Sequence, residues 1–367
     1  MRAVVIGTGI IGAAVGYRLA QRGVRVTLLE ERRPGGGTSG SSFAWVNANG
    51  KSPRDYFDLN VAGMREHRSV AEELPNTWFH PGGDLEWADG EAATTRLADK
   101  VERLREWGYR VEWRTAAELR ELEPDLAPLD DGARVAHYVD ESWIDPLPLV
   151  GQLLAAARRH GAEVRSGTAV SRVVVTAGRV EAVEAGGELF GADLFVNCAG
   201  PRAGALAEMA GSSLPMRNSV GLLLTTEPAA TTLAHVVHAP GIYFRPEGAG
   251  RLMLGSHGAD RGEAPRREDA ATSPVATEML AAARRVLPAL DGVEIEAARL
   301  GTRAIPADGM PAVGWLPGLD NLYAVATHSG ITLSLLLGRL AANELVGGEV
   351  EPSLATLRPS RLLAATS

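Results

Sequence analysis

The stretch that decides the fold is Ala3-Val4-Val5-Ile6-Gly7-Thr8-Gly9-Ile10-Ile11-Gly12, close to the start of the chain. Its first four residues form a short apolar run, which is typical of a strand buried on both faces of a parallel sheet. The three glycines follow at the spacing G-x-G-x-x-G, and an apolar helical stretch continues to about Arg22. Residues 25–30 read as a second strand. The pattern therefore predicts a strand–turn–helix–strand unit that binds a dinucleotide.

Each glycine has its own role in such a unit. Gly7 permits the tight turn, Gly9 lets a pyrophosphate approach the backbone, and Gly12 lets helix and strand pack closely. The start of the helix offers free N–H groups and a partial positive charge to phosphates. Glu30 ends the second strand, where it can bind ribose hydroxyls and disfavour a 2′-phosphate. The motif alone leaves FAD and NAD as alternative ligands.

Composition narrows the class of protein further. A chain of 367 residues suggests two domains, and 45% hydrophobic with 22% charged residues is typical of a globular protein. The net charge of −8 argues against a nucleic-acid partner, and no apolar run is long enough to form a transmembrane segment. The single cysteine, Cys198, excludes an intramolecular disulfide and a cysteine-based metal site, so we expect no metal. Because the first strand begins by residue 2 or 3, we expect no targeting peptide and a cytoplasmic protein.

The order of the expected elements indicates two domains threaded through one another. Strands and helices of α/β type occupy both ends and the middle of the chain, and β-rich segments separate them. We expect an α/β (α+β two-domain) fold, with a Rossmann-like nucleotide-binding domain interleaved with a β-rich substrate domain. The first domain comprises residues 1–75, 144–213 and 298–367, and the second comprises 76–143 and 214–297. Helices are expected at 54–74, 91–107, 115–122, 146–160, 274–286 and 330–346.

Four collinear stretches resemble the D-amino-acid-oxidase-like flavoprotein family, which includes glycine oxidase, sarcosine oxidase and D-amino-acid dehydrogenases. The first is the dinucleotide unit from Val4 to Glu30. The others are Gly35-Gly36-Gly37-Thr38-Ser39-Gly40-Ser41-Ser42 with Phe43-Ala44-Trp45-Val46-Asn47, then Leu194-Phe195-Val196-Asn197-Cys198-Ala199-Gly200-Pro201, and finally Leu300-Gly301-Thr302-Arg303, Asp308-Gly309-Met310-Pro311 and Thr327-His328-Ser329-Gly330-Ile331-Thr332. A nicotinamide dehydrogenase would not need the second or fourth stretch.

The resemblance implies FAD as cofactor and a set of residues that bind it. That set is Gly7, Gly9, Ile10, Ile11, Gly12, Glu30, Glu31, Arg32, Thr38, Ser41, Ser42, Ala44, Trp45, Asn47, Val170, Cys198, Ala199, Gly200, Arg303, Ser329, Gly330, Ile331 and Thr332. The helix that begins at Gly330 would face the flavin ring, where its N–H groups and dipole stabilise negative charge. Cys198 does not match the family's attachment point, and the second stretch contains no histidine. We therefore expect FAD to be bound non-covalently.

The catalytic and substrate residues that the resemblance implies are Arg303, Tyr243, Arg245, Lys51 and His328. Arg303 matches the arginine that clamps a substrate carboxylate, a task suited to its planar fork. In the family a proline often follows this arginine, whereas here Ala304 follows it, so a structural ion pair is the alternative. Tyr243 and Arg245 share one face of a strand and could both point at the ligand, or could belong to an ordinary half-buried strand.

Lys51 follows the second of these stretches and could favour electron transfer to oxygen. The simpler interpretation is that it is a solvated lysine in a loop. His328 belongs to the His-x-Gly part of the closing signature. His257 and His80 have ambiguous roles.

The resemblance predicts FAD-dependent oxidation of a C–N bond in a small amino acid or amine. A hydride would pass to flavin N5, giving an imine and a reduced flavin that O₂ or another acceptor reoxidises. Four alternatives remain open. The protein could be a dehydrogenase that passes electrons to a quinone or partner protein, or a biosynthetic tailoring enzyme acting on a secondary amine or cyclic imino acid. It could also be a flavin-binding subunit with no competent site of its own, or a nicotinamide-dependent dehydrogenase.

Overall fold

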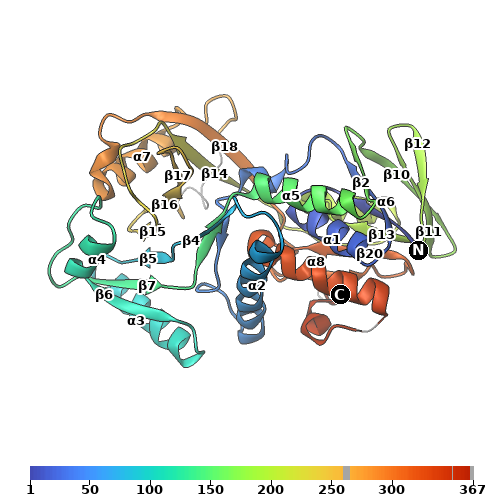
Figure 1. Ribbon diagram of the computed structural model, residues 1–367, viewed down its shortest axis with the longest axis horizontal. Coiled ribbons are helices and arrows are strands. Elements are labelled where there is room, and N and C mark those ends of the chain that lie inside the picture. The colour runs from blue at the N-terminus through green and yellow to red at the C-terminus, as the bar shows by residue number, and fades with distance from the viewer. Residues whose placement is uncertain (259–264, 349, 364–367) are drawn as a thin grey trace.

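The computed structural model describes residues 1–258, 265–348 and 350–363. Two halves lie side by side in Figure 1, one around a six-stranded sheet and the other around an eight-stranded sheet. Both ends of the chain lie in the half that contains the six-stranded sheet (Figure 1). The chain therefore leaves this half and returns to it, as expected for interleaved domains.

The six-stranded sheet has the order β19-β20-β13-β1-β2-β9. All its neighbouring strands pair in parallel except β19, which is antiparallel to β20. The strands are β1 (Arg2–Ile6), β2 (Arg25–Glu30), β9 (Glu163–Ser166), β13 (Leu194–Asn197), β19 (Ala312–Trp315) and β20 (Leu322–Ala326). The helices of this half are α1 (Ile10–Gln21), α5 (Pro146–Arg159), α6 (Ala203–Met209) and α8 (Gly330–Gly347). β13 is buried along its whole length, as the apolar run of a central parallel strand predicts.

Two glycines fix the position at which α8 begins. A Cβ on Gly338 would lie 2.8 Å from the backbone of Ala14, so this glycine lets α8 and α1 approach closely. α2 (Arg54–Glu73) crosses the same helix, and a Cβ on Gly63 would lie 2.5 Å from the carbonyl oxygen of Thr332. These close contacts hold α8 between α1 and α2.

The eight-stranded sheet has the order β18-β14-β17-β16-β15-β5-β7-β6. Its strands are β5 (Asp84–Glu86), β6 (Val111–Thr115), β7 (Arg134–Tyr138), β14 (Ser219–Thr226), β15 (Val236–Ala239), β16 (Ile242–Pro246), β17 (Leu252–Gly255) and β18 (Ile295–Arg303). α3 (Glu91–Glu106), α4 (Ala116–Leu122) and α7 (Pro274–Val286) complete this half (Figure 1). α4 begins with a capping box, in which Thr115 and Glu118 satisfy each other's backbone N–H groups.

Two smaller sheets complete the fold. The first contains β10 (Val170–Thr176), β11 (Arg179–Ala185) and β12 (Glu188–Gly191), and the second contains β3 (Trp45–Val46), β4 (Phe79–Pro81) and β8 (Ser142–Ile144). Short 3₁₀ segments lie at Thr38–Ser41, Gly200–Arg202, Pro288–Leu290, Pro352–Leu357 and Pro359–Leu362. The second small sheet is built from three segments far apart in sequence, so it ties the segment around β3 to the remainder of the fold.

One expected domain boundary falls inside a strand. β18 pairs with β14 over its length, up to the pair Ser219 and Arg303. Residues 298–303 thus belong by hydrogen bonding to the eight-stranded sheet, although the sequence placed them in the nucleotide-binding domain. The strand continues because Ala298 and Leu300, two residues apart, pack against the core of the eight-stranded sheet. The rest of the proposed division remains a prediction.

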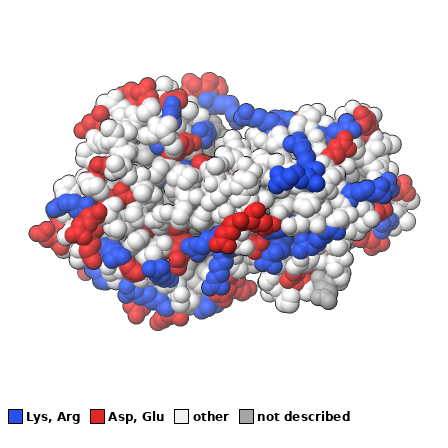
Figure 2. All heavy atoms as spheres, in the orientation of Figure 1, with Lys and Arg blue, Asp and Glu red and all other residues white. Residues whose placement is uncertain are grey.

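None of the helices in the described ranges combines the length and apolar character that crossing a membrane requires. Basic and acidic side chains are interspersed over both halves on the face that Figure 2 shows. This is the pattern of a hydrated surface, whereas proteins that attract polyanions gather one sign of charge.

Candidate active site

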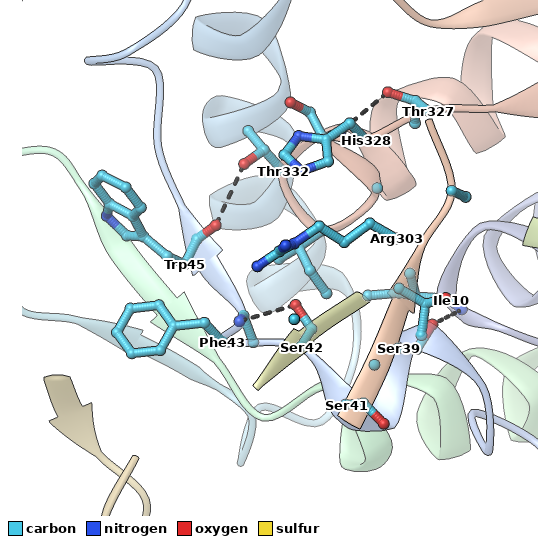
Figure 3. A pocket seen from close by; sticks show the side chains of 18 of the residues that line it. Ile10, Ser39, Ser41, Ser42, Phe43, Trp45, Arg303, Thr327, His328 and Thr332 are labelled. Atoms are coloured by element: carbon cyan, nitrogen blue, oxygen red, sulfur yellow. Dashed lines mark hydrogen bonds between the residues drawn. The ribbon is translucent and has the colours of Figure 1, made fainter. Parts of the chain in front are cut away.

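A cavity of about 500 Å³ lies where the two halves meet. Its walls come from the start of α1, the segment 38–47, the start of α8 and one face of the eight-stranded sheet (Figure 3). Of the residues expected from the sequence, those that line the cavity are Gly9, Ile10, Ile11, Thr38, Ser41, Ser42, Ala44, Trp45, Asn47, Lys51, Cys198, Gly200, Tyr243, Arg303, His328, Ser329, Gly330, Ile331 and Thr332. Those that do not line it are Gly7, Gly12, Glu30, Glu31, Arg32, Val170, Ala199 and Arg245.

The glycine turn has the close contacts that its motif predicts. Gly7 has φ +99°, and a Cβ there would lie 2.5 Å from the carbonyl oxygen of Cys198. A Cβ on Gly12 would lie 2.0 Å from the carbonyl oxygen of Gly7. Gly7 therefore lets the turn approach the end of β13, Gly12 lets α1 pack against the turn, and Gly9 brings the start of α1 to the cavity.

Ser39 is a residue at this turn that the expected set omitted. Its Oγ accepts a hydrogen bond from the backbone N–H of Ile10 at 2.9 Å, at the first residue of α1. Helix starts have unpaired N–H groups, so a hydroxyl here caps the helix beside the cavity. Ser39 lies in the second family-like stretch, and this position could have marked it as a cofactor-site residue.

The carboxylate of Glu30 already accepts hydrogen bonds from residues in and beside the glycine turn. Its carboxylate accepts hydrogen bonds from the N–H and the hydroxyl of Thr8, both at 2.9 Å, and from the N–H of Arg32 at 3.0 Å. These bonds join the glycine turn to the end of β2. Contact with a ribose remains a prediction for Glu30. Glu31 forms ion pairs with Arg32 and Arg202.

The segment 42–47 is held against the start of α8. The N–H of Asn47 donates to Oγ1 of Thr332 at 3.2 Å, and Ala44 adopts φ +60°. Ser329, the residue before α8, shares a hydrogen bond of 2.6 Å with the phenol of Tyr56. The first N–H groups of α8 thus open to the same cavity as the start of α1. The starts of α1 and α8 thus face one cavity. This arrangement suits a dinucleotide whose phosphates lie near one helix start and whose polar ring lies near the other.

Arg303 reaches into this cavity along the surface of the eight-stranded sheet. Figure 3 shows its side chain extending past Ser42 toward Trp45. A Cβ on Gly221 would lie 2.4 Å from Nη2 of Arg303, so the guanidinium occupies space that the glycine leaves. Tyr243 uses a second glycine in the same way, because a Cβ on Gly255 would lie 2.2 Å from its ring. Because Gly221 and Gly255 have no side chains, both Arg303 and Tyr243 can lie directly against the backbone of the sheet.

Aromatic rings cover the same end of the cavity. Phe43 meets Tyr243 edge to face at 4.8 Å between centroids, and Trp45 lies 4.4 Å from the imidazole of His238. Tyr243 lies 5.4 Å from His238 and 5.0 Å from His257. These rings give an apolar border to the space in front of Arg303, which strengthens electrostatic contacts there.

Behind these rings lies a buried group of ionisable side chains that the sequence did not reveal. Nδ1 of His238 is 2.7 Å from Oδ1 of Asp84, and Nδ2 of Asn49 lies between Asp84 at 3.4 Å and Glu141 at 3.1 Å. Tyr109 donates to Glu141 at 2.6 Å. Burial, and next the charge of Asp84, raise the pKa of Glu141 to about 8.

Lys51 lines the cavity as expected, but it is not a solvated loop lysine. Burial lowers the pKa of its ammonium group, and the negative charge of Glu141 opposes that shift in part. The cation is thus held in a site that disfavours its charge. His80, the other ambiguous histidine, stacks on Trp143 at 3.7 Å and does not line the cavity.

Arg245 corrects one expectation, because it does not reach the cavity. Only 1% of this residue is exposed, its Nε donates to the carbonyl oxygen of Phe43 at 2.5 Å, and its guanidinium lies 4.6 Å from the ring of Trp143. Burial lowers the pKa of Arg245 to about 10. Arg245 starts from the same strand face as Tyr243, but its long side chain turns away to Phe43 and Trp143. It borders a second cavity, together with Arg32 and Asp145.

The chain belongs to the FAD dependent oxidoreductase family, whose model matches residues 2–344. It is 28% identical to glycine oxidase of Geobacillus kaustophilus, over 92% of this chain and 91% of that protein. It is 26% identical to glycine oxidase of Bacillus licheniformis, over 95% and 94%. It is also 26% identical to an uncharacterized oxidoreductase, YurR, of Bacillus subtilis, over 98% and 99%.

Solved structures agree on the fold. The crystal structure of glycine oxidase from Geobacillus kaustophilus superposes with a TM-score of 0.86 at 26% identity, covering 98% of this chain and 99% of that one. The L-proline dehydrogenase from P. horikoshii superposes with a TM-score of 0.85, and at 20% identity it supports the fold alone. The family and fold expected from the sequence are thus confirmed, and the protein is an enzyme that uses FAD.

Proposed function

We propose that the protein oxidises the C–N bond of a small amine that carries a carboxylate, such as an amino acid. The observation that carries this proposal is the Arg303 guanidinium, which lies over Gly221 in a cavity lined also by the start of α8. A planar guanidinium in a cavity lined by aromatic rings suits a carboxylate better than it suits a neutral amine. The similarity to glycine oxidases supports the same substrate class.

FAD, when bound, accepts the hydride that leaves the carbon next to the substrate nitrogen. The residues of the chain supply binding, orientation and electrostatics. Arg303 would hold the carboxylate, Tyr243 and the neighbouring rings would restrict how the substrate lies, and water would be excluded. The first turn of α8, from Gly330, would stabilise negative charge in the part of the cavity that it faces.

We further propose that FAD is held without a covalent bond. Cys198 lines the cavity, but burial raises the pKa of its thiol well above the ordinary value. The reactive thiolate is therefore scarce, and a thioether to the flavin would not form. Yellow colour in the supernatant after acid precipitation is the expected result, and colour retained in the pellet would contradict it.

We propose O₂ as the acceptor of the electrons, because Lys51 lines the cavity. The ammonium group of Lys51 on the cavity wall would stabilise negative charge developing on oxygen. Hydrogen peroxide formed in proportion to substrate consumed is expected. Turnover with an artificial quinone but without peroxide would favour a dehydrogenase.

The test of the substrate class compares matched pairs of amines under anaerobic conditions. Glycine is paired with methylamine, and each D-amino acid or cyclic imino acid with its decarboxylated analogue. A carboxylate-bearing member should bleach the flavin band while its partner does not, and Arg303→Ala should raise KM for that substrate with FAD retained. Equal bleaching by both members, or none across the panel, would contradict the proposal.

A further inference from the structure

His238 has a buried acidic partner and faces the substrate end of the cavity. It lies on β15, beside the parallel strand β5 that carries Asp84. Asp84 is 0% exposed and its Oδ1 is 2.7 Å from Nδ1 of His238. A carboxylate in this position fixes the tautomer with the proton on Nδ1 and stabilises the doubly protonated ring. Nε2 is then the ring nitrogen that can accept a proton.

The ring of His238 is held in one orientation by its neighbours. Trp45 lies 4.4 Å away on one side, while Tyr243 and His257 stack at 5.4 Å and 6.2 Å. All four residues line the cavity that also contains Arg303. A substrate whose carboxylate is bound by Arg303 would thus have aromatic rings and one imidazole around the rest of the molecule.

The proposed reaction requires a proton acceptor at this place. An amino acid carries an ammonium group at neutral pH, and hydride loss from the adjacent carbon needs the nitrogen lone pair. The ammonium must therefore lose a proton before oxidation. Glu141 is an unsuitable acceptor, because it does not line the cavity and its carboxyl oxygens already accept hydrogen bonds from Tyr109 and Asn49.

The geometry points to His238, held by Asp84, as the group that takes the proton of the substrate ammonium. The N–H bond of the ammonium breaks, its electron pair stays on the substrate nitrogen, and the proton forms a bond to Nε2. The positive charge then lies between Asp84 and the ring stack. This inference rests on the proposed function, to which it adds a catalytic residue.

Other charged groups around His238 are already paired. Glu86, the register partner of His238 on β5, binds Lys100 at 2.6 Å and Tyr138 at 2.7 Å. Tyr243 and His257 face His238 from β16 and from the end of β17. Asp84 is thus the carboxylate in direct contact with the imidazole. Burial raises the pKa of Asp84, and the hydrogen bond from His238 opposes that shift.

The first experiment measures the rate of anaerobic flavin reduction against pH in His238→Gln and Asp84→Asn. His238→Gln should lower the rate at pH 7 by roughly 10²–10⁴-fold, the usual contribution of a positioned acid or base. The rate should return toward that of the wild type at high pH, where the substrate arrives as a free amine. Asp84→Asn should show a smaller loss in the same direction.

His80→Gln, a histidine outside the cavity, is the matched control and should leave the profile unchanged. A loss in His238→Gln that is the same at every pH would overturn the inference.

A second experiment does not depend on turnover. The analogue 2-aminoisobutyrate has a carboxylate and an ammonium but no hydrogen on the adjacent carbon, so it binds without being oxidised. In proton NMR it should move one histidine ring resonance to the protonated position, and this shift should be absent in His238→Gln. Binding without the shift would overturn the inference. If the shift occurs but no amino acid bleaches the wild-type flavin, the proposed function fails and the role of His238 as proton acceptor stands.

Discussion

The guanidinium of Arg303 lies against the backbone of Gly221, so that a Cβ on this glycine would be 2.4 Å from Nη2. Gly221 pairs with Gly301, two residues before Arg303 on β18, and the arginine side chain crosses diagonally onto β14. The position of the guanidinium therefore depends on a missing side chain on the neighbouring strand. The sequence motif identifies Arg303 as a candidate, but it does not predict that Gly221 leaves the space for its guanidinium.

Gly221→Ala should displace the Arg303 guanidinium without unfolding the sheet, because the atom in the way is the end of a flexible side chain. KM for a carboxylate-bearing amine should rise by about ten-fold or more, since hydrogen bonds to charged groups contribute about 1.5–3 kcal/mol. FAD content should stay unchanged. The control is Gly191→Ala on β12, where a Cβ would only reach an ordinary contact of 3.4 Å. An unchanged KM in Gly221→Ala would show that Arg303 does not bind the carboxylate.

Gly12→Ala should abolish FAD binding and destabilise the protein. The new Cβ would lie 2.0 Å from the carbonyl oxygen of Gly7, a backbone atom that cannot yield without opening the turn. Overpacking of this kind costs about 1–3 kcal/mol or more. Thermal unfolding and flavin absorbance measure the two effects.

Gly151→Ala is the matched control for Gly12→Ala. Gly151 lies inside α5 with nothing within 4 Å of a Cβ, so alanine should stabilise the helix by about 0.5–1 kcal/mol. Normal flavin content in Gly12→Ala would contradict the assignment of the glycine turn.

Glu141→Gln should change how stability depends on pH. The pKa of Glu141 is raised from 4.5 to about 8 in the folded state, so between these values the folded protein holds a proton that the unfolded chain has lost. This stabilising contribution is complete below pH 4.5 and is lost as pH rises to about 8, at a slope of at most about 1.4 kcal/mol per pH unit.

Urea unfolding of the wild type and of Glu141→Gln at several pH values measures this difference. The wild type should lose stability with rising pH relative to the variant. Parallel curves would show that Glu141 ionises normally.

Arg245→Met should destabilise the fold while leaving KM for the substrate unchanged. The carbonyl oxygens of Phe43 and Pro246 would lose their donors, and each buried unpaired group costs about 1–3 kcal/mol. Arg134→Met is the comparison, because Arg134 also lies over a tryptophan ring, at 4.0 Å from Trp113, but is exposed. It should cost less than about 1 kcal/mol. A large KM change in Arg245→Met would restore this arginine to the substrate site.

The cofactor half of the site could be predicted from the sequence because its signals are local. The glycine turn and the start of α8 each combine a strand, a turn and a helix within a short stretch, and the backbone there makes the contacts. Arg245 could not be predicted in the same way. The two-residue period of a strand gives the face from which a side chain starts, but not where a long side chain ends.

The group around His238 was missed because its members lie far apart in the chain. Asn49, Asp84, Glu141 and His238 meet only after β5 pairs in parallel with β15, and no spacing in the sequence records that pairing. The sequence does, however, allow one neighbour of His238 to be predicted. The Pro240-Gly241 turn predicts a hairpin, and its register places His238 directly opposite Tyr243.

The central claim is tested most directly by anaerobic reduction of the purified yellow protein with an amino acid that bleaches it, in normal form and with deuterium on the carbon next to nitrogen. The account predicts that deuterium slows bleaching several-fold, since this C–H bond breaks in the measured step. It also predicts one carbonyl product per flavin reduced. A protein whose flavin no carboxylate-bearing amine reduces, or one reduced with no isotope effect and no carbonyl product, would contradict the account.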